Sequence, residues 1–118
     1  MASYIRYLFK TVRKFFGEAV VVTQEVDDII SSPIVKETII NNSDCKILLD
    51  QRKYQNKFDQ IQNLLGLTDK ERAQILSINL ANAANRRYKE VWIGLGGTQS
   101  AVYATEVSGE EYLCYTTE

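Results

Sequence analysis

The chain has 118 residues, 14 of them basic and 15 acidic, so it fits one domain and carries no overall charge that would attract a nucleic acid or another polyanion. It contains no histidine, which excludes Ser-His and Cys-His nucleophile pairs and removes the ligand of most zinc sites. The two cysteines, Cys45 and Cys114, have no CxxC spacing, so we expect reduced thiols in a cytoplasmic protein. The longest apolar run, 19–22, is too short to cross a bilayer.

The beginning of the chain predicts a helix that ends at Gly17. Apolar residues recur there at three- and four-residue spacing, at Ile5, Leu8, Phe9, Val12 and Phe16. Basic residues on the same helix are also a feature of membrane-surface helices, but the apolar stripe has the width of a core-packed face, which we favour. Because the helical register starts almost at the first residue, we expect the chain to begin partway through a larger protein.

The next segment predicts a strand, a helix and a second strand. Residues 19–22, Ala-Val-Val-Val, are typical of a strand buried on both faces of a parallel sheet. Ser32-Pro33 is a favourable helix start, and Asn41-Asn42 should end that helix. A second apolar strand is expected over 45–49. We therefore expect a βαβ unit with a right-handed crossover, with 19–22 and 45–49 forming a parallel sheet core.

The middle of the chain predicts a pair of helices. The first ends at Gly66 and has apolar residues at Tyr54, Phe58, Ile61, Leu64 and Leu65. Thr68 and Glu71 have the spacing of a capping box, which begins the second helix. We expect the apolar residues of that helix at Ala73, Leu76 and Leu80.

The C-terminal part changes to a period of two, which predicts a β-hairpin. Apolar and β-branched residues alternate on both sides of Gly96-Gly97, at Val91, Ile93 and Leu95 and then at Ala101, Tyr103, Thr105 and Val107. Gly94 and the two following glycines also suggest a phosphate loop, but no lysine follows them, and we favour a hairpin turn. The sequence GxxxxGK[ST] is absent from the 118 residues. Residues 110–118 should form a short helix or an unravelled end.

Polar residues at two predicted strand ends are candidates for chemistry. Thr23 and Gln24 follow the first strand, at the edge where ligands bind in open α/β sheets. A glutamine there can orient a water molecule or a terminal phosphate, or can simply satisfy a turn. Asp50 follows the second strand, like the metal-linked acid of a nucleotide hydrolase. Without a phosphate loop in the chain, we favour a solvated strand end for Asp50.

A set of segments in fixed order resembles the late part of the RecA-like motor domain of conjugation ATPases. The most similar family is the TraG type of conjugative transposons, which is related to the ATPase that energises type IV secretion. The resemblance extends over essentially all 118 residues. The segments that carry it are 20–24, Ser32-Pro33-Ile34, Asn42, 46–49, 65–68, 91–96 and 101–107.

The resemblance implies a fold and a domain assignment. It implies an α/β fold that is part of a RecA-like P-loop NTPase domain, with a parallel sheet core flanked by helices and a C-terminal β-hairpin. Residues 1–118 would be a C-terminal fragment of that domain. The phosphate loop and the metal-binding acidic motif should both precede the first helix, so the fragment alone is expected to be inactive.

The resemblance also implies roles for individual residues. In the wider superfamily, the glutamine after the apolar strand senses the terminal phosphate, and this role corresponds to Gln24, with Thr23 beside it at the nucleotide. The same motors often place an arginine finger on the helix before this strand. That position corresponds to Arg13, with the neighbouring Lys14 as the alternative.

The resemblance further implies cofactors and partners for the full-length protein. ATP and magnesium would be its cofactors, although we expect neither to bind to this fragment. The motor would be a hexameric ring at the cytoplasmic face of the inner membrane, in contact with secretion-channel proteins. DNA, protein and pilus subunits are all candidate cargoes.

A free-standing α/β protein-interaction module without a nucleotide role explains the composition equally well. A phosphate loop encoded upstream would favour the motor, whereas a start codon preceded by a stop codon would favour the module. For a fragment, we also expect apolar surface that promotes self-association.

Overall fold

The chain combines helices with a three-stranded sheet, as expected of the α/β class. It divides into two compact units, Met1–Asp44 and Cys45–Glu118. Within the described ranges, no helix has the length and apolar character that a membrane span requires. The computed structural model describes residues 2–25, 31–80, 88–96 and 99–116.

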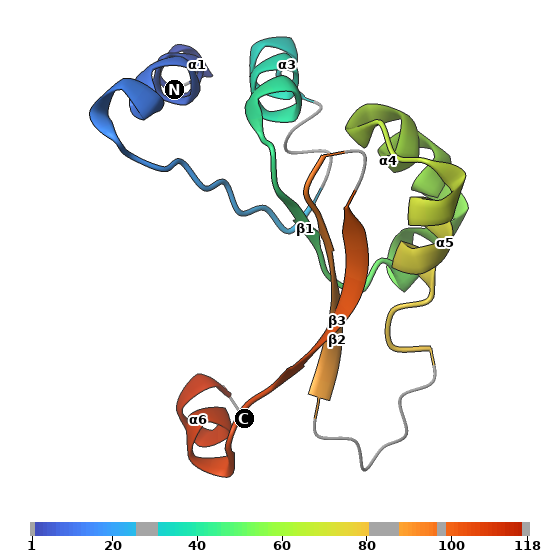
Figure 1. Cartoon of the computed structure of the whole chain (residues 1–118). Coiled ribbons are helices and arrows are strands. Elements are labelled where there is room, and N and C mark those ends of the chain that lie inside the picture. The colour runs from blue at the N-terminus through green and yellow to red at the C-terminus, as the bar shows by residue number, and fades with distance from the viewer. Residues whose placement is uncertain (1, 26–30, 81–87, 97–98, 117–118) are drawn as a thin grey trace. The chain divides into compact units, whose positions relative to one another are not determined.

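In the described part of the first unit, the α-helices α1 (Ala2–Thr11) and α3 (Pro33–Asn42) lie side by side (Figure 1). The predicted start of α3 at Pro33 and its end at the paired asparagines are confirmed. Among the described side chains of α3, Thr38 and Ile39 are buried, with exposed fractions of 5% and 7%. The apolar stripe of α1 is half-buried and faces away from solvent more than its basic side chains do.

The end of the first helix differs slightly from the prediction. A short 3-10 helix, η1 (Val12–Phe15), follows α1, and Phe16 rather than Gly17 adopts the left-handed conformation, with φ 55°. Gly17 is needed for space instead. A Cβ atom at that position would lie 2.8 Å from Cγ2 of Val12, closer than side chains pack.

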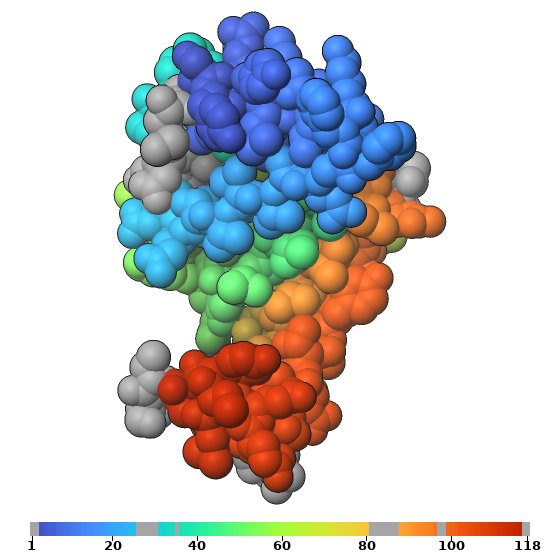
Figure 2. Space-filling model, turned by 90° about the vertical axis from the view of Figure 1, so that its left-hand side faces the viewer, coloured from blue at the N-terminus to red at the C-terminus, as the bar shows by residue number. Residues whose placement is uncertain are grey.

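The predicted first strand is not formed. Residues 19–22 run as an extended segment outside the sheet, and Val20 and Val22 are 81% and 89% exposed (Figure 1). Figure 2 shows this segment in light blue on the surface. A β-branched run becomes a buried strand only where neighbouring strands accept its hydrogen bonds and other layers cover its faces. Among the described residues, no strand pairs with 19–22.

The sheet belongs to the second unit, and it is antiparallel rather than parallel. Its strands are β1 (Lys46–Leu48), β2 (Tyr88–Gly94) and β3 (Ser100–Glu106), in the order β1-β2-β3. The predicted hairpin is confirmed as β2 and β3. The second strand of the predicted βαβ unit, β1, pairs with β2 of this hairpin instead of with 19–22. The free edge of β2 thus provides the hydrogen-bonding partner of β1, and the two strands run antiparallel.

The helices of the second unit are η2 (Arg52–Lys57), α4 (Phe58–Leu65), α5 (Asp69–Leu76) and α6 (Gly109–Tyr115). Gly66 ends α4 in the left-handed conformation with φ 66°, as predicted. The capping box is also confirmed. The Thr68 hydroxyl accepts a hydrogen bond from the Glu71 backbone N–H, and the Glu71 carboxylate accepts one from the Thr68 backbone N–H.

One face of the sheet packs against α5 and forms the core of the second unit (Figure 1). Ile75 and Ile78 are buried there, whereas Leu80, which we expected to face the core, is 64% exposed. Ala73, which we also expected on the core face, is exposed, and Leu76 is only half-buried. The buried side of α5 and its following turn is instead the one that carries Glu71, Ile75 and Ile78, so the predicted face was wrong. The buried apolar side chains of this unit are Phe58, Ile61, Leu67, Ile75, Ile78 and Trp92.

The opposite side of the sheet, which we call the open face, is largely apolar, with Ile47, Leu95 and Tyr103 exposed and its central residues half-buried. The strand register places Ile47 beside Ile93 and Ile93 beside Ala101, in one row across all three strands. Because side chains alternate along a strand, the residues two positions away share this side. The open face consists of Ile47, Lys89, Val91, Ile93, Leu95, Ala101, Tyr103 and Thr105.

Candidate functional site

The candidate phosphate sensor, Gln24, lies on a tight turn in the first unit. The Thr23 hydroxyl accepts a hydrogen bond from the Glu25 backbone N–H at 3.3 Å and donates one to the Glu25 carbonyl oxygen at 2.9 Å. These two bonds close the turn around Gln24 without using its side chain. The side chain is exposed and forms no hydrogen bond with another described residue. Its amide is therefore free to bind an external polar group.

The candidate arginine finger, Arg13, lies on η1 with its guanidinium at the surface. Its Nη2 atom donates to Oδ2 of Asp44 at 2.6 Å, and the two side chains are 77% and 82% exposed. An exposed ion pair of this kind contributes at most about 1 kcal/mol. Asp44 therefore holds Arg13 loosely. Lys14, the predicted alternative, is the next residue of η1 and is also exposed.

Arg13 and Gln24 do not form one internal cluster. Within the part of the chain that the structure describes, no hydrogen bond or ion pair joins them. Each side chain instead extends from the first unit into solvent. This arrangement allows the two residues to contact different molecules.

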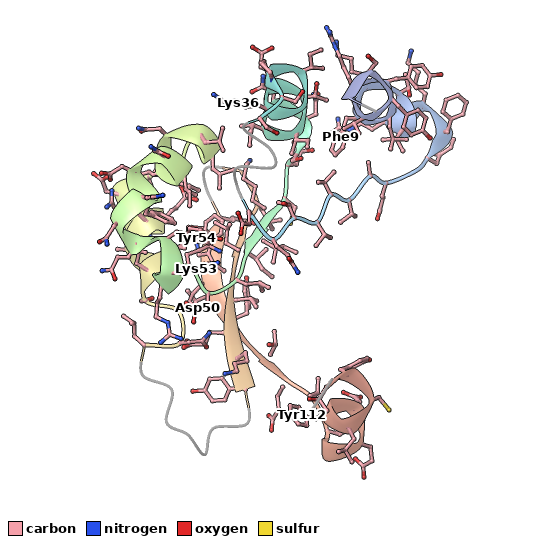
Figure 3. All side chains as sticks on the ribbon, turned by 180° about the vertical axis from the view of Figure 1, so that it is seen from behind. Phe9, Lys36, Asp50, Lys53, Tyr54 and Tyr112 are labelled. Atoms are coloured by element: carbon pink, nitrogen blue, oxygen red, sulfur yellow. The ribbon has the colours of Figure 1, made fainter. Side chains whose placement is uncertain are left out.

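The carboxylate of Asp50 is part of a structural network in the second unit. It lies just beyond β1 (Figure 3) and accepts hydrogen bonds from Nε of Arg52 at 3.0 and 2.9 Å and from Nδ2 of Asn79 at 3.4 Å. The Arg52 guanidinium is the main reason why the pKa of Asp50 lies below its ordinary value of 3.8, although burial opposes the shift. The carboxylate is thus satisfied by protein groups, unlike a carboxylate kept open for a metal.

Among the described residues, no group of three or more His, Cys, Asp or Glu side chains could hold a metal ion. We favoured a solvated strand end for Asp50, whereas the structure binds its carboxylate to Arg52 and Asn79. It gives no support to the alternative interpretation of Asp50 as the metal-linked acid of a nucleotide hydrolase.

The glycines near residue 96 belong to the hairpin and not to a phosphate loop. Gly96 has φ 73°, and the Leu95 backbone N–H donates to the Gln99 carbonyl oxygen at 2.8 Å, which closes the turn between β2 and β3. Gly94 lies against the ring of the buried Trp92. A Cβ atom there would lie 2.2 Å from the ring of Trp92, so only glycine leaves room for the indole. Gly97 lies outside the described residues.

Sequence reasoning missed two polar contacts that join α5 and its following turn to the sheet. Asn79, at φ 61°, accepts a hydrogen bond from the Glu90 backbone N–H at 2.9 Å, and its own N–H donates to the Glu90 carboxylate at 3.0 Å. Gln74 Oε1 accepts from Trp92 Nε1 at 3.2 Å. An asparagine after a helix is a known signal for the left-handed conformation, so Asn79 could have been found. The Gln74 contact has no such local signal.

Comparisons with known proteins give one match. No curated protein and no solved structure matches the chain. The model of the family described as the TraG P-loop domain matches residues 1–118, which is the whole length. It agrees with the ordered segments that suggested a conjugation ATPase. The chain belongs to the TraG P-loop domain family.

Proposed function

We propose that this chain is the late part of the motor domain of an ATPase that powers conjugative transfer, and that Gln24 senses the terminal phosphate of ATP in its own subunit. The observation that carries the proposal is the exposed Gln24 amide on a turn that Thr23 closes. Membership of a conjugation-related P-loop family supports it. The turn fixes the backbone of Gln24 and leaves its side-chain amide free. Such an amide can orient a phosphate oxygen or the attacking water.

The 118 residues do not provide the whole nucleotide site. They contain no GxxxxGK[ST] sequence, and the described residues contain no metal-binding group of acids. Bound Mg²⁺ and a phosphate-loop lysine would neutralise charge on the phosphates. What the chain offers to ATP is therefore a polar amide at Gln24 and a cation at Arg13. A calorimetric titration of the chain alone with Mg-ATP should show no binding heat.

Arg13 is proposed to act on ATP held by the neighbouring subunit of a ring. Developing negative charge on the transferred phosphoryl group attracts a guanidinium strongly, whereas the exposed Asp44 carboxylate holds it weakly. Breaking the ion pair between Arg13 and Asp44 to contact the phosphate should therefore require little free energy. Lys14 suits the role less well, because an ammonium group lacks the planar fork that contacts two oxygens at once.

The exposed segment 19–22 is proposed to become a strand of a parallel sheet in the complete motor domain. Val20 and Val22 are 81% and 89% exposed, which is unfavourable for a run of β-branched side chains in water. Neighbouring strands on both sides would cover them. Gln24 would then lie at the carboxyl end of that strand, where such sheets bind ligands.

The proposal is tested in the full-length motor with Arg13→Ala and Gln24→Ala. Loss of an arginine finger lowers turnover by about 10³–10⁵-fold where it has been measured, and ATP affinity should change little. Lys36→Ala is the matched control, because it removes an exposed basic side chain from α3 without touching the proposed site. A wild-type rate for Arg13→Ala would show that the finger assignment is wrong, and a wild-type rate for Gln24→Ala would do the same for the sensor.

A mixing experiment separates the two roles. Arg13→Ala subunits mixed with subunits whose phosphate loop is inactivated should regain activity, because an intact phosphate loop then faces an intact arginine. Gln24→Ala subunits should regain nothing in the same mixture, because the sensor acts in its own subunit. Rescue of both variants, or of neither, would contradict this division of roles.

A second candidate function is a protein-interaction module without a nucleotide role. The observation that favours it is the open face, where Ile47 is 61% exposed and Tyr103 is 51% exposed. The two functions are distinguished by the coding sequence upstream of this chain. A phosphate loop there supports the motor, and a start codon preceded by a stop codon supports the module.

A further inference from the structure

A polar groove lies between α1 and α3, and both helices belong to the first unit. Its volume is about 220 Å³. Arg6 and Lys10, which are about one helical turn apart, line the groove from α1. Residues at three- and four-residue spacing share the face of α3 that lines it from the other side. They include Ile34, Glu37, Thr38 and Asn41.

The side chain of Thr38 is buried at this groove and lacks a polar partner. It is 5% exposed, and its hydroxyl forms no hydrogen bond with another described residue. The backbone carbonyl oxygen of Thr38, by contrast, accepts a hydrogen bond from Nδ2 of Asn42 at 2.8 Å. Buried hydroxyl groups in native proteins nearly always have a hydrogen-bond partner. The groove is the side from which an external group can reach this hydroxyl.

The charged side chains that line the groove also lack partners. Arg6, Lys10 and Glu37 form no ion pair with another described residue. Two like charges one turn apart on a helix repel each other. A water molecule would satisfy the Thr38 hydroxyl, but it would not neutralise two cations. A bound anion would do both.

Glu37 narrows the class of anion. Its carboxylate repels an anion without protons but accepts a hydrogen bond from an anion that keeps one. Inorganic phosphate near neutral pH carries both negative charge and a proton, whereas sulfate and charged carboxylates carry no proton. A phosphate ester has a second pKa of about 6, so above that pH it has lost its last proton. The groove is also smaller than the roughly 300–1,000 Å³ of pockets that enclose larger ligands, so it does not suit a nucleoside triphosphate.

We propose that the groove between α1 and α3 binds inorganic phosphate. The guanidinium of Arg6 and the ammonium of Lys10 donate hydrogen bonds to its charged oxygens, and so does the Thr38 hydroxyl. The protonated oxygen of the phosphate donates to the Glu37 carboxylate. The inference does not depend on the proposed nucleotide role, because neither of the two residues assigned to that role lines the groove.

The test is an NMR titration of the 118-residue chain with sodium phosphate at neutral pH and constant ionic strength. We expect saturable shifts of the Thr38 backbone amide and the Asn41 side-chain amide. Sulfate should bind at least about tenfold more weakly, because it has no proton for Glu37. Methyl phosphate, titrated above its second pKa, should also bind more weakly, which separates the free ion from an ester as the source of the phosphate. Equal binding of phosphate and sulfate, or no saturable shift with phosphate, would overturn the proposal.

Variants of two lysines test whether the attraction is specific to the groove. Lys10→Ala should weaken phosphate binding at least about tenfold, because it removes a charged donor. Lys36→Ala is the matched control, since it removes the same charge from the side of α3 away from the groove (Figure 3) and should leave the affinity unchanged. Equal losses in the two variants would mean a general attraction of the anion to positive charge, and the site would be wrong.

Two further variants on α3 test the chemistry of recognition. Glu37→Gln should abolish the preference for phosphate over sulfate, because the amide donates to a sulfate oxygen and no longer repels it. Thr38→Val removes the hydroxyl and keeps the branched shape, so it should weaken phosphate binding. Without phosphate, hydrogen exchange in α1 and α3 of Thr38→Val should be no faster than in the wild type, because the hydroxyl has no partner to lose. An unchanged preference in Glu37→Gln, or an unchanged affinity in Thr38→Val, would contradict the proposed contacts.

Discussion

The two units of the chain differ in where their notable polar side chains lie. In the second unit, buried polar groups have protein partners, such as Trp92 Nε1 on Gln74 and the Glu90 N–H on Asn79. In the first unit, the residues that suggest chemistry, Arg13 and Gln24, extend into solvent. The comparison teaches that the buried polar contacts and the proposed functional side chains lie in different units. The second unit contains most of the buried apolar side chains, whereas the first presents Gln24 at the surface and Arg13 in an exposed ion pair with Asp44.

The largest effect is expected at Trp92, which is 1% exposed at the centre of the second unit. Trp92→Ala should lower the free energy of unfolding of that unit by about 3–5 kcal/mol, because it leaves a large cavity and removes one of the two donors, Trp92 Nε1 and Ser100 Oγ, from which Gln74 Oε1 accepts. Urea denaturation followed by circular dichroism measures this. Trp92→Phe keeps a ring and should cost less.

The same variant tests whether the units are independent. If they are, hydrogen exchange of α1 and α3 should stay unchanged in Trp92→Ala. Faster exchange in both helices would show that the first unit depends on the core of the second. The two units would then differ in the groups that they expose, but they would not unfold independently.

The next effect is expected at Asn79, which links the end of α5 to β2. Asn79→Ala removes the acceptor of the buried Glu90 N–H and leaves alanine at φ 61°, so it should cost about 2 kcal/mol or more. Asn79→Gly removes the same acceptor but relieves the backbone strain. The difference between the two variants in urea denaturation isolates the conformational part. Equal costs would mean that strain contributes nothing.

Much of this fold could be predicted from local signals. The capping box at Thr68, the left-handed Gly66 and the hairpin after Ile93 each depend on residues close in sequence. The direction of β1 could not be predicted, because it depends on a partner more than forty residues away. Nor could alternation tell which side of β2 is covered, since Trp92 on one side and Ile93 on the other are both apolar.

The candidate site shows the same limit. Gln24 is a candidate from its place after an apolar run and Arg13 only through a resemblance, and the structure adds what no local pattern contains. The pairing of Arg13 with Asp44 spans 31 positions. The exposure of Val20 and Val22 was also hidden from the sequence, because a β-branched run indicates a strand and says nothing about whether neighbours exist to cover it.

A smaller effect is expected for Asp50 and is sensitive to pH. The Arg52 guanidinium holds the pKa of Asp50 below 3.8, so the native state favours the charged carboxylate more than the unfolded state does. This contribution to stability is present above about pH 4 and is lost as pH falls through the lower native pKa. Comparing the unfolding of the wild type and Asp50→Asn from neutral to acid pH should show a difference that shrinks below pH 4. A constant difference would contradict it.

The smallest effect on stability is expected at Val22. It tests whether the segment 19–22 of the first unit is exposed in solution. Because this side chain is 89% exposed, Val22→Ala should change stability by less than about 0.5 kcal/mol. Ile39→Ala is the matched control in the same unit. Ile39 is 7% exposed, so removing its side chain should cost about 2–5 kcal/mol.

The stability of both variants is measured by hydrogen exchange in α1 and α3. Tryptophan fluorescence would not serve, because the single tryptophan, Trp92, lies in the second unit. An unchanged Val22→Ala beside a destabilised Ile39→Ala would establish that 19–22 is uncovered in the free chain. A cost above about 1 kcal/mol for Val22→Ala would mean that this segment is buried in solution, since exposed positions do not show such values. The same substitution in the complete motor should then be costly if 19–22 is a strand there. The difference between the cost of Val22→Ala in the free chain and in the complete motor measures how far the rest of the motor buries this side chain.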